Sequence, residues 1–293
     1  MSYYLVYDIG GTSVKYSLMD EVANVMESSS FHTPEERDGS IFELLIHTTE
    51  SFQQRYPLSG LALSVPAAVD VMSGYVHYAG QITDFIGKNL KDELEQLGIP
   101  IELENDANCA ALAEKWKGHA QDCNSFVCVT IGTGIGGAIY LNGDLYRGKK
   151  GMAGEVGLMY MNASQPIEST TFSRLGSTWN LLNRVFIKTG ERVSGEELFE
   201  RYYRGDHRIV DEVDKFFDTL AIGAANLIHT LAPEKILFGG GISAQPNFTN
   251  HIKERLDHMS PGLLDLTQID VCKHRNTAGQ IGALYHFHKM KKK

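Results

Sequence analysis

The sequence is poor in cysteine and in long hydrophobic runs. Its 293 residues include four cysteines, none in a C-x-x-C pair, so we expect neither a disulfide framework nor a cysteine-based zinc site. Free thiols in a reducing compartment are the simplest account. Apolar stretches fall short of the roughly 20 residues that a membrane-spanning helix needs. The N-terminal stretch MSYYLVYDIGG lacks a basic region and soon reaches Asp8, so we expect no signal sequence and a cytoplasmic protein.

Positive charge is also scarce. The chain has 27 Lys and Arg against 36 Asp and Glu, and its net charge is -9. This balance argues against general binding to nucleic acid or to a membrane surface. The one basic run, HKMKKK at the C-terminus, is most simply a solvated tail. The 43% hydrophobic content and the length allow two domains, each with its own core.

Strand-like and helix-like segments alternate along the chain, which indicates the α/β class. We expect strands at 3–7, 13–19, 61–67, 75–78, 101–105, 126–131, 135–141, 235–239 and 267–273. We expect helices at 40–55, 107–114, 194–203, 207–231 and 278–289. A domain boundary is placed near Trp116: residues 1–116 and a closing helix at 277–293 would form one domain, and residues 117–276 the other.

Two segments have the same strand, glycine turn and strand pattern. They are VYDIGGTSVKYSL, at 6–18, and VTIGTGIGGAIYL, at 129–141. The match is loose, but it indicates a duplicated half-molecule in which each copy contributes one glycine hairpin.

The second of these turns contains G-x-G-x-x-G at Gly132, Gly134 and Gly137. A dinucleotide-binding motif must open a helix, whereas this one runs into a strand, so a dehydrogenase is not favoured. The alternatives are a plain hairpin or a turn whose backbone N–H groups bind an anion. A third glycine cluster at 239–241 follows another strand and favours a nucleotide site.

Two acidic positions at strand ends allow a structural and a chemical interpretation. Asp8 either forms an Asx-type turn or helps to hold Mg²⁺ through water. In IELENDANCAALAE, Asn105 and Asp106 stand between a strand and a helix. They suit a helix N-cap, and they also suit a site at the carboxyl end of a strand.

Five motifs together resemble the ROK family of sugar kinases and sugar-linked repressors. In chain order they are DIGGT at 8–12, ENDANCAALAE at 104–114, IGTGIGGAI at 131–139, AGEVG at 153–157 and APEKILFGGGIS at 232–243. The resemblance implies an actin-like (ribonuclease H-like) fold, in which two α/β domains flank a central cleft. It also implies ATP and Mg²⁺ on one side of that cleft and a sugar on the other.

The resemblance implies a role for each matching residue. Asp106 matches the catalytic base, and Asn105 and Glu155 match groups that bind the sugar. Asp8 would hold Mg²⁺, most simply through water. The residues that match phosphate- and nucleotide-binding positions are Asp8, Ile9, Gly10, Gly11, Thr12, Gly132, Thr133, Gly134, Gly239, Gly240 and Gly241.

The chain departs from the family pattern in three places. Leu158 stands where many members have a histidine after the GE-x-G segment. The cysteine-rich zinc motif that follows in those members is missing, so we expect no structural zinc. Gln81 stands near an asparagine of many relatives and could bind substrate in its place, or could be a loop residue.

The sequence therefore predicts an ATP-dependent kinase that phosphorylates the 6-hydroxyl of the glucosyl unit of β-glucosides such as cellobiose. N-acetylmannosamine kinase and a glucokinase-like hexose kinase are the alternatives, and a catalytically silent sugar sensor is the non-enzyme alternative. We expect the kinase branch because the repressors carry a helix-turn-helix domain before the first strand, which here starts at about Tyr3. The family resemblance also suggests a homodimer.

Overall fold

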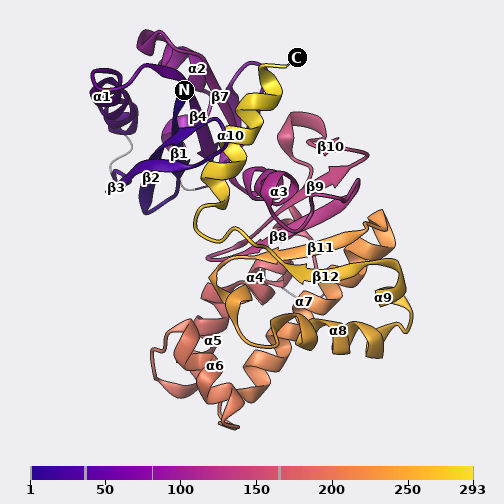
Figure 1. Ribbon diagram of the computed structural model, residues 1–293. Helices are drawn as coiled ribbons and strands as arrows, with labels where there is room; N and C mark the ends of the chain where they lie inside the picture. Colours follow the sequence, from indigo (N-terminus) through magenta and orange to yellow (C-terminus); the bar gives the residue numbers. More distant parts are fainter. Residues whose placement is uncertain (1, 36–37, 81, 164–165, 293) are drawn as a thin grey trace. The chain divides into compact units, whose positions relative to one another are not determined.

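The computed structural model describes residues 2–35, 38–80, 82–163 and 166–292 (Figure 1). The chain divides into two compact units. Unit 1 comprises Met1–Lys117, Arg147–Ala153 and Asn276–Lys293, and unit 2 comprises Gly118–Tyr146 and Gly154–Arg275. The sequence had not indicated that the short segment Arg147–Ala153 belongs with the N-terminal residues.

Unit 1 is built on a five-stranded sheet in the order β3-β2-β1-β4-β7. β1 pairs antiparallel with β2, and β4 and β7 continue from β1 in parallel. The strands are β1 (Tyr3–Ile9), β2 (Ser13–Asp20), β3 (Val25–His32), β4 (Leu58–Val65) and β7 (Ile101–Asn105). A separate two-stranded ribbon consists of β5 (Ala67–Asp70) and β6 (Tyr75–Ala79).

Helices cover both faces of this sheet, because β1 and β4 are apolar on both sides. α1 (Ser40–Gln53) packs on the face that includes Leu5 and Tyr7. α3 (Asp106–Lys117) and α10 (Ala278–Met290) lie side by side on the other face, against Tyr4 and Val6 (Figure 1). The short helix α2 (Leu90–Glu93) precedes β7.

Unit 2 repeats the topology of unit 1. Its sheet has the order β10-β9-β8-β11-β12, again with an antiparallel hairpin followed by two parallel strands. The strands are β8 (Phe126–Ile131), β9 (Ile135–Leu141), β10 (Asp144–Leu145), β11 (Lys235–Gly239) and β12 (Gln268–Val271). The equal sheet orders confirm the predicted repeat of the glycine hairpins.

The α-helices of unit 2 follow β10 in the chain. They are α4 (Phe172–Gly176), α5 (Thr178–Thr189), α6 (Gly195–Tyr203), α7 (Val210–Leu231), α8 (Phe248–Met259) and α9 (Leu263–Leu266). α6 and α7 confirm two predicted helices, although α7 begins three residues later than expected. The buried side of α7, which includes Phe216 and Phe217, forms the centre of the core of this unit.

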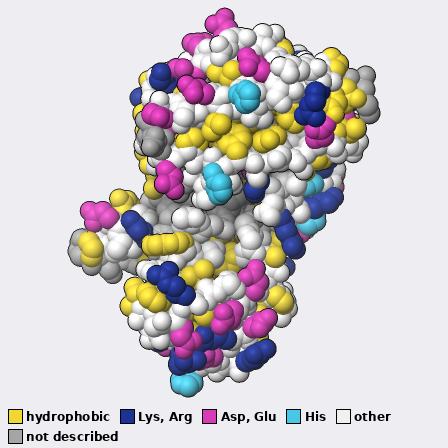
Figure 2. Space-filling view, turned by 90° about the vertical axis from the view of Figure 1, so that its left-hand side faces the viewer, with side chains coloured by type: hydrophobic (Ala, Val, Ile, Leu, Met, Phe, Trp, Pro, Cys, Tyr) yellow, Lys and Arg dark blue, Asp and Glu magenta, His cyan; other side chains and the backbone are white. Residues whose placement is uncertain are grey.

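The outer surface is of mixed polarity. On the face seen in Figure 2, acidic and basic side chains are intermixed and hydrophobic side chains lie among them. Within the described ranges, no helix combines the length and the hydropathy that a membrane crossing requires.

Candidate functional site

The carboxyl ends of β1, β4 and β7 lie at one edge of the sheet of unit 1, because these strands are parallel. Asp8 is in register with Ser64, and Ser64 is in register with Glu104, so the three side chains form a row on one face. The Ser64 hydroxyl donates a hydrogen bond to Asp8 Oδ1 at 2.8 Å. Burial raises the pKa of the Asp8 carboxyl, and the Ser64 hydrogen bond opposes that rise.

A buried thiol of unit 1 is influenced by the charges of these acids. The pKa of Cys109, in α3, is raised well above its ordinary value. Burial is the largest cause, followed by the charges of Glu104, Asp8 and Asp106. The sheet therefore gathers Asp8 and Asp106, two of the acids predicted from the sequence, around one point of unit 1.

Asn105 caps α3, and its amide still has a second Nδ2 hydrogen and a second Oδ1 lone pair for further hydrogen bonds. Asn105 Oδ1 accepts a hydrogen bond from the backbone N–H of Asn108 at 3.0 Å, as an N-cap residue does. Its Nδ2 donates to the carbonyl of Ala67 at 3.2 Å. Asp106 begins α3 with an exposed side chain, and its Oδ1 accepts from the N–H of Ala107. The cap thus leaves an exposed carboxylate at the carboxyl end of a parallel strand.

The first glycine turn directly follows Asp8 and Ile9 at the end of β1. Ile9 is buried at the end of β1, and the N–H of Gly10 donates to the carbonyl of Ser13 at 3.0 Å. Thr33 holds the turn from the side, since its hydroxyl donates to the carbonyl of Gly10 and its N–H to the carbonyl of Thr12. Gly11 and Thr12 remain accessible at the tip of the turn.

The second glycine turn lies at a pocket of unit 2 with a volume of about 350 Å³. Three of the residues predicted to bind the nucleotide line it: Gly132, Thr133 and Gly241. Gly134, Gly239 and Gly240 do not line the pocket. Gly240 instead carries the chain over the end of β8 with a φ of 91°, where a Cβ would overlap the carbonyl oxygen of Ile131. These glycines shape the turn that brings Gly241 to the pocket.

The sequence interpretation did not assign a binding role to the other residues of this pocket. They are Ile131, Thr178, Trp179, Leu182, Gly195, Glu196, Ile242 and Gln245. The side chain of Trp179 is exposed, with 52% exposure for the residue, and its backbone N–H donates to the carbonyl of Gly132 at 3.4 Å. The hydroxyl oxygen of Thr178 is buried and has no hydrogen-bond partner in the part of the chain that is described. A pocket with an aromatic side chain, exposed turn glycines and an unsatisfied hydroxyl suits a nucleoside phosphate.

Glu155 lies in unit 2, in a segment that packs on the start of β9. A Cβ at Gly157 would overlap the carbonyl oxygen of Ile135, and one at Gly154 would lie 2.8 Å from that of Gly137. The glycines of the GE-x-G motif are therefore required for close packing. Glu155 between them is half-buried, and burial raises the pKa of its carboxyl. Leu158, directly after the motif, is 56% exposed.

Gln81, a predicted substrate-binding residue, lies outside the described residues. For Mg²⁺, Asp8 offers a single carboxylate, with one oxygen engaged by Ser64. A single carboxylate fits an ion that keeps most of its water and binds substrate phosphates.

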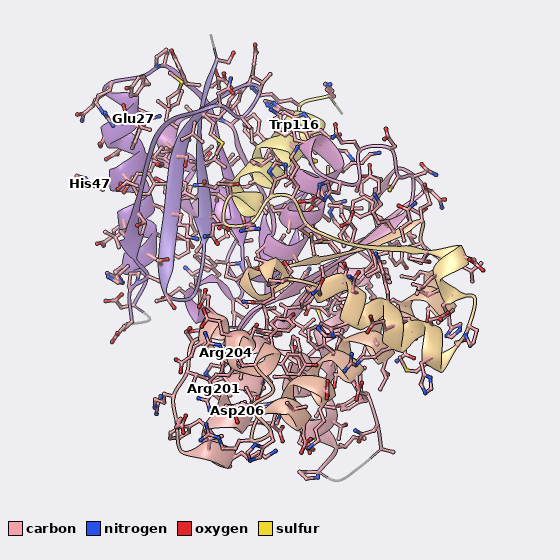
Figure 3. All side chains as sticks on the ribbon, turned by 60° about the horizontal axis from the view of Figure 1, so that its bottom comes forward. Glu27, His47, Trp116, Arg201, Arg204 and Asp206 are labelled. Atoms are coloured by element: carbon pink, nitrogen blue, oxygen red, sulfur yellow. The ribbon has the colours of Figure 1, made fainter. Side chains whose placement is uncertain are left out.

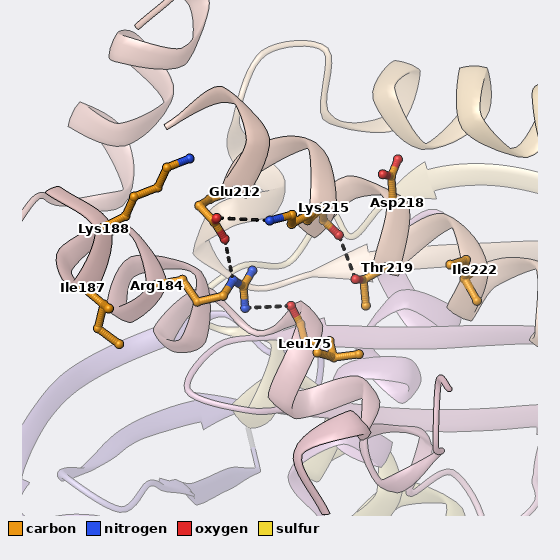
Figure 4. A pocket seen from close by; sticks show the side chains of 9 residues that line it. All are labelled: Leu175, Arg184, Ile187, Lys188, Glu212, Lys215, Asp218, Thr219 and Ile222. Carbon is orange, nitrogen blue, oxygen red and sulfur yellow. Dashed lines mark hydrogen bonds and ion pairs between the residues drawn. The ribbon is translucent and has the colours of Figure 1, made fainter. Parts of the chain in front are cut away.

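Another cavity of unit 2 is not lined by the residues predicted to act in catalysis or binding. It has a volume of about 690 Å³ and is lined by residues of α4, α5 and α7 (Figure 4). Three of its charged groups pair with one another, since Glu212 accepts from Arg184 at 3.1 Å and from Lys215 at 3.3 Å. None of the residues predicted to bind ATP or sugar lines this cavity, so we place the candidate site at the smaller pocket and at the edge of the unit 1 sheet.

Comparison with known proteins agrees with the motifs. The sequence pattern of the ROK family matches residues 4–290. The chain belongs to the ROK family. It is similar to the β-glucoside kinase of Listeria monocytogenes serovar 1/2a, with 36% identity over 288 residues that cover 96% of each chain.

Solved structures of similar proteins support the assignment of the chain to this family. One is a candidate N-acetylmannosamine kinase from Listeria monocytogenes, with 33% identity, a TM-score of 0.91 and 99% coverage of both chains. Another is a ROK family protein from Streptococcus pneumoniae TIGR4 in complex with sucrose, with 28% identity, a TM-score of 0.89 and 99% coverage of both chains. The predicted actin-like α/β fold is thereby confirmed.

Proposed function

We propose that this protein, an ATP-dependent carbohydrate kinase, transfers the γ-phosphoryl group of ATP to the 6-hydroxyl of the glucosyl unit of β-glucosides such as cellobiose. The observation that carries the choice of substrate is the exposed Leu158, directly after the GE-x-G motif. A histidine at this position would offer a polar contact to a free reducing end. Leucine offers an apolar surface to an aglycone instead.

On the sugar side, Asp106 acts as the general base. Its exposed carboxylate at the start of α3 accepts the proton of the sugar hydroxyl as the oxygen attacks phosphorus. Asn105 and Glu155 bind sugar hydroxyls. Burial raises the pKa of Glu155, so its carboxylate is a strong hydrogen-bond acceptor when ionised.

On the nucleotide side, the turn at 10–12 and the pocket of unit 2 bind ATP. The backbone of Gly132 and the hydroxyl of Thr133 face the phosphates, and Trp179 offers its ring to the adenine. Asp8 would hold Mg²⁺ through water. When bound, Mg²⁺ neutralises charge on the transferring phosphoryl group. Dependence on ATP fits a cytoplasmic enzyme.

N-acetylmannosamine kinase is the second candidate, because the structural neighbour from Listeria monocytogenes bears that description. Two relatives favour a glycoside. The similar curated protein is named a β-glucoside kinase, and the Streptococcus pneumoniae protein was solved with a disaccharide.

A coupled ATP-to-ADP assay with cellobiose, gentiobiose, an aryl β-glucoside, glucose and N-acetylmannosamine tests the proposal. We expect turnover on the first three sugars.

We expect Asp106→Asn to lower kcat by about 10²–10⁴-fold while calorimetry still detects sugar binding. Leu158→His should shift the preference from cellobiose towards glucose. Turnover on N-acetylmannosamine alone would select the second candidate, and no turnover on any sugar would favour a sugar sensor.

A further inference from the structure

Glu104 fixes the backbone that carries the proposed base. It lies at the end of β7 and is 1% exposed. Its Oε1 accepts from the backbone N–H of Asn105 at 2.9 Å and from Nδ2 of Asn108 at 2.9 Å. These donors lie one residue before and two residues after Asp106, so the Glu104 carboxylate is bonded to the first turn of α3 on both sides of Asp106.

Arg147 in turn fixes the other oxygen of Glu104. Its Nε lies 2.8 Å and its Nη2 2.6 Å from Glu104 Oε2. His286 Nδ1, from α10, is 3.6 Å from the same oxygen. Burial lowers the pKa of His286 to about 4, so this imidazole is neutral at neutral pH. The positive charge that balances the buried Glu104 is therefore supplied by Arg147.

We propose that Arg147 is a positioning residue for phosphoryl transfer, and this inference rests on the proposed kinase function. Its two-point contact with Glu104 leaves Oε1 aimed at Asn105 and Asn108, and thereby holds Asp106 in place. Arg147 touches neither ATP nor sugar in this scheme. It also opens the segment Arg147–Ala153, which belongs to unit 1 and leads along the chain to Glu155.

The same strand contains a matched control. Glu102 precedes Glu104 by two residues and pairs with Lys91, whose Nζ lies 2.9 Å from Glu102 Oε2. Both side chains are about one-fifth exposed (21% and 20%). No hydrogen bond joins Glu102 to the start of α3 among the described residues, so Lys91→Met removes an ion pair from β7 without releasing Asn105.

The surroundings of Arg147 also permit chemical rescue. Arg147 lines a cavity of unit 1 with a volume of about 500 Å³, together with Val69, His77 and Lys150. Truncation to alanine would enlarge this cavity next to Glu104. Methylguanidinium added to Arg147→Ala could then occupy the vacated place and restore the two-point contact.

The experiment measures kcat and KM on cellobiose for Arg147→Met, Arg147→Lys, Arg147→Ala and Lys91→Met, with the folded fraction of each taken from circular dichroism. We expect Arg147→Met to lower kcat by about 10- to 100-fold with little change in the KM for ATP. Arg147→Lys should recover part of the loss, because lysine keeps the charge but makes one contact. Methylguanidinium should raise the activity of Arg147→Ala several-fold, and Lys91→Met should resemble the wild type.

Equal losses in Arg147→Met and Lys91→Met, after correction for folded fraction, would overturn the inference. So would an Arg147→Ala variant that methylguanidinium leaves unchanged. If Arg147→Met does not fold, the kcat of Arg147→Lys and the rescue of Arg147→Ala by methylguanidinium test the inference instead. A wild type that turns over none of the five sugars is a different result, because it refutes the proposed function itself.

Discussion

The two units have the same sheet order, yet their glycine hairpins differ at one chemically important position. In unit 1, Asp8 pairs with Lys15 one step before the last paired residues, Ile9 and Val14. In unit 2, Thr130 occupies the corresponding place, opposite Gly136. The fold thus supplies two similar turns at strand ends. Only unit 1 therefore has an acidic side chain next to its turn.

The strand that pairs in parallel with the first strand of each hairpin ends differently in the two units. β4 ends at Val65 and is followed by Pro66, whereas β11 runs into Gly239, Gly240 and Gly241. In unit 2 the glycines allow the chain to pass close to the end of β8. Gly240 has a φ of 91°, and a Cβ there would overlap the carbonyl oxygen of Ile131, whereas a Cβ at Gly241 would meet no atom within 4 Å.

The largest effect that we expect from this comparison concerns stability. Gly240→Ala should lower the free energy of unfolding by about 1–3 kcal/mol from the backbone conformation alone, and the clash with Ile131 adds to this loss. Gly241→Ala should change it by less than about 0.5 kcal/mol, because the site is open. Urea denaturation of both variants checks the difference. Equal midpoints would mean that the two glycines do not differ in this way.

The sequence predicted those parts of the fold that have strong local signals. The alternation of strands and helices, the repeated hairpin and α7 follow from apolar periodicity and from glycine turns. β3 was missed because VMESSSFH is mostly exposed and has little apolar alternation. It is a strand through its pairing with β2, which is a tertiary effect. α5 and α8 were also missed, although both are amphipathic.

The candidate site divides in the same way. Asp8, Asn105 and Asp106 stand beside strand ends in the sequence, so they could be found there. The contact of Glu104 with Arg147 and His286 joins three distant parts of the chain, and no local pattern signals it. Trp179 and Gln245 meet at one pocket for the same reason.

The units also differ in where their charges lie. Unit 2 has a surface network in which Arg201 pairs with Asp206 at 2.8 Å (Figure 3). Hydrogen bonds from Arg208 and Arg201 hold the pKa of Asp206 well below its ordinary value. Arg208 and Glu191, which belong to the same network, are about half exposed (49% and 46%), so water and salt screen their ion pair and we expect little stability from it. Unit 1 instead encloses Glu104 and His286.

A moderate effect of pH should therefore come from unit 1. Burial lowers the pKa of His286 from 6.5 to about 4 in the folded chain. Between these values the unfolded chain binds more protons, so the free energy of unfolding falls as pH decreases from 6.5 towards 4. The loss between pH 7 and pH 5 should be about 2 kcal/mol.

His286→Gln should flatten this pH dependence, since glutamine does not titrate. His251→Gln, in unit 2, is the control, because His251 is less deeply buried. Chemical denaturation at pH 7 and pH 5 measures both variants. A His286→Gln variant with the pH slope of the wild type would refute the assignment of the effect to His286.

The smallest expected effect is on ATP binding and tryptophan fluorescence, since each unit contains one of the two tryptophans. Trp116, in unit 1, stacks on Tyr285 with ring centroids 5.2 Å apart (Figure 3 labels Trp116), whereas Trp179 lines the proposed nucleotide pocket. ATP should quench the fluorescence of Trp116→Phe, which keeps Trp179, but not that of Trp179→Phe. Trp179→Ala should weaken ATP binding about tenfold, since stacking of a base on an aromatic ring contributes about 1–3 kcal/mol. Quenching that persists in Trp179→Phe would place the adenine away from this pocket and would leave the two glycine turns as the phosphate-binding part of the proposal.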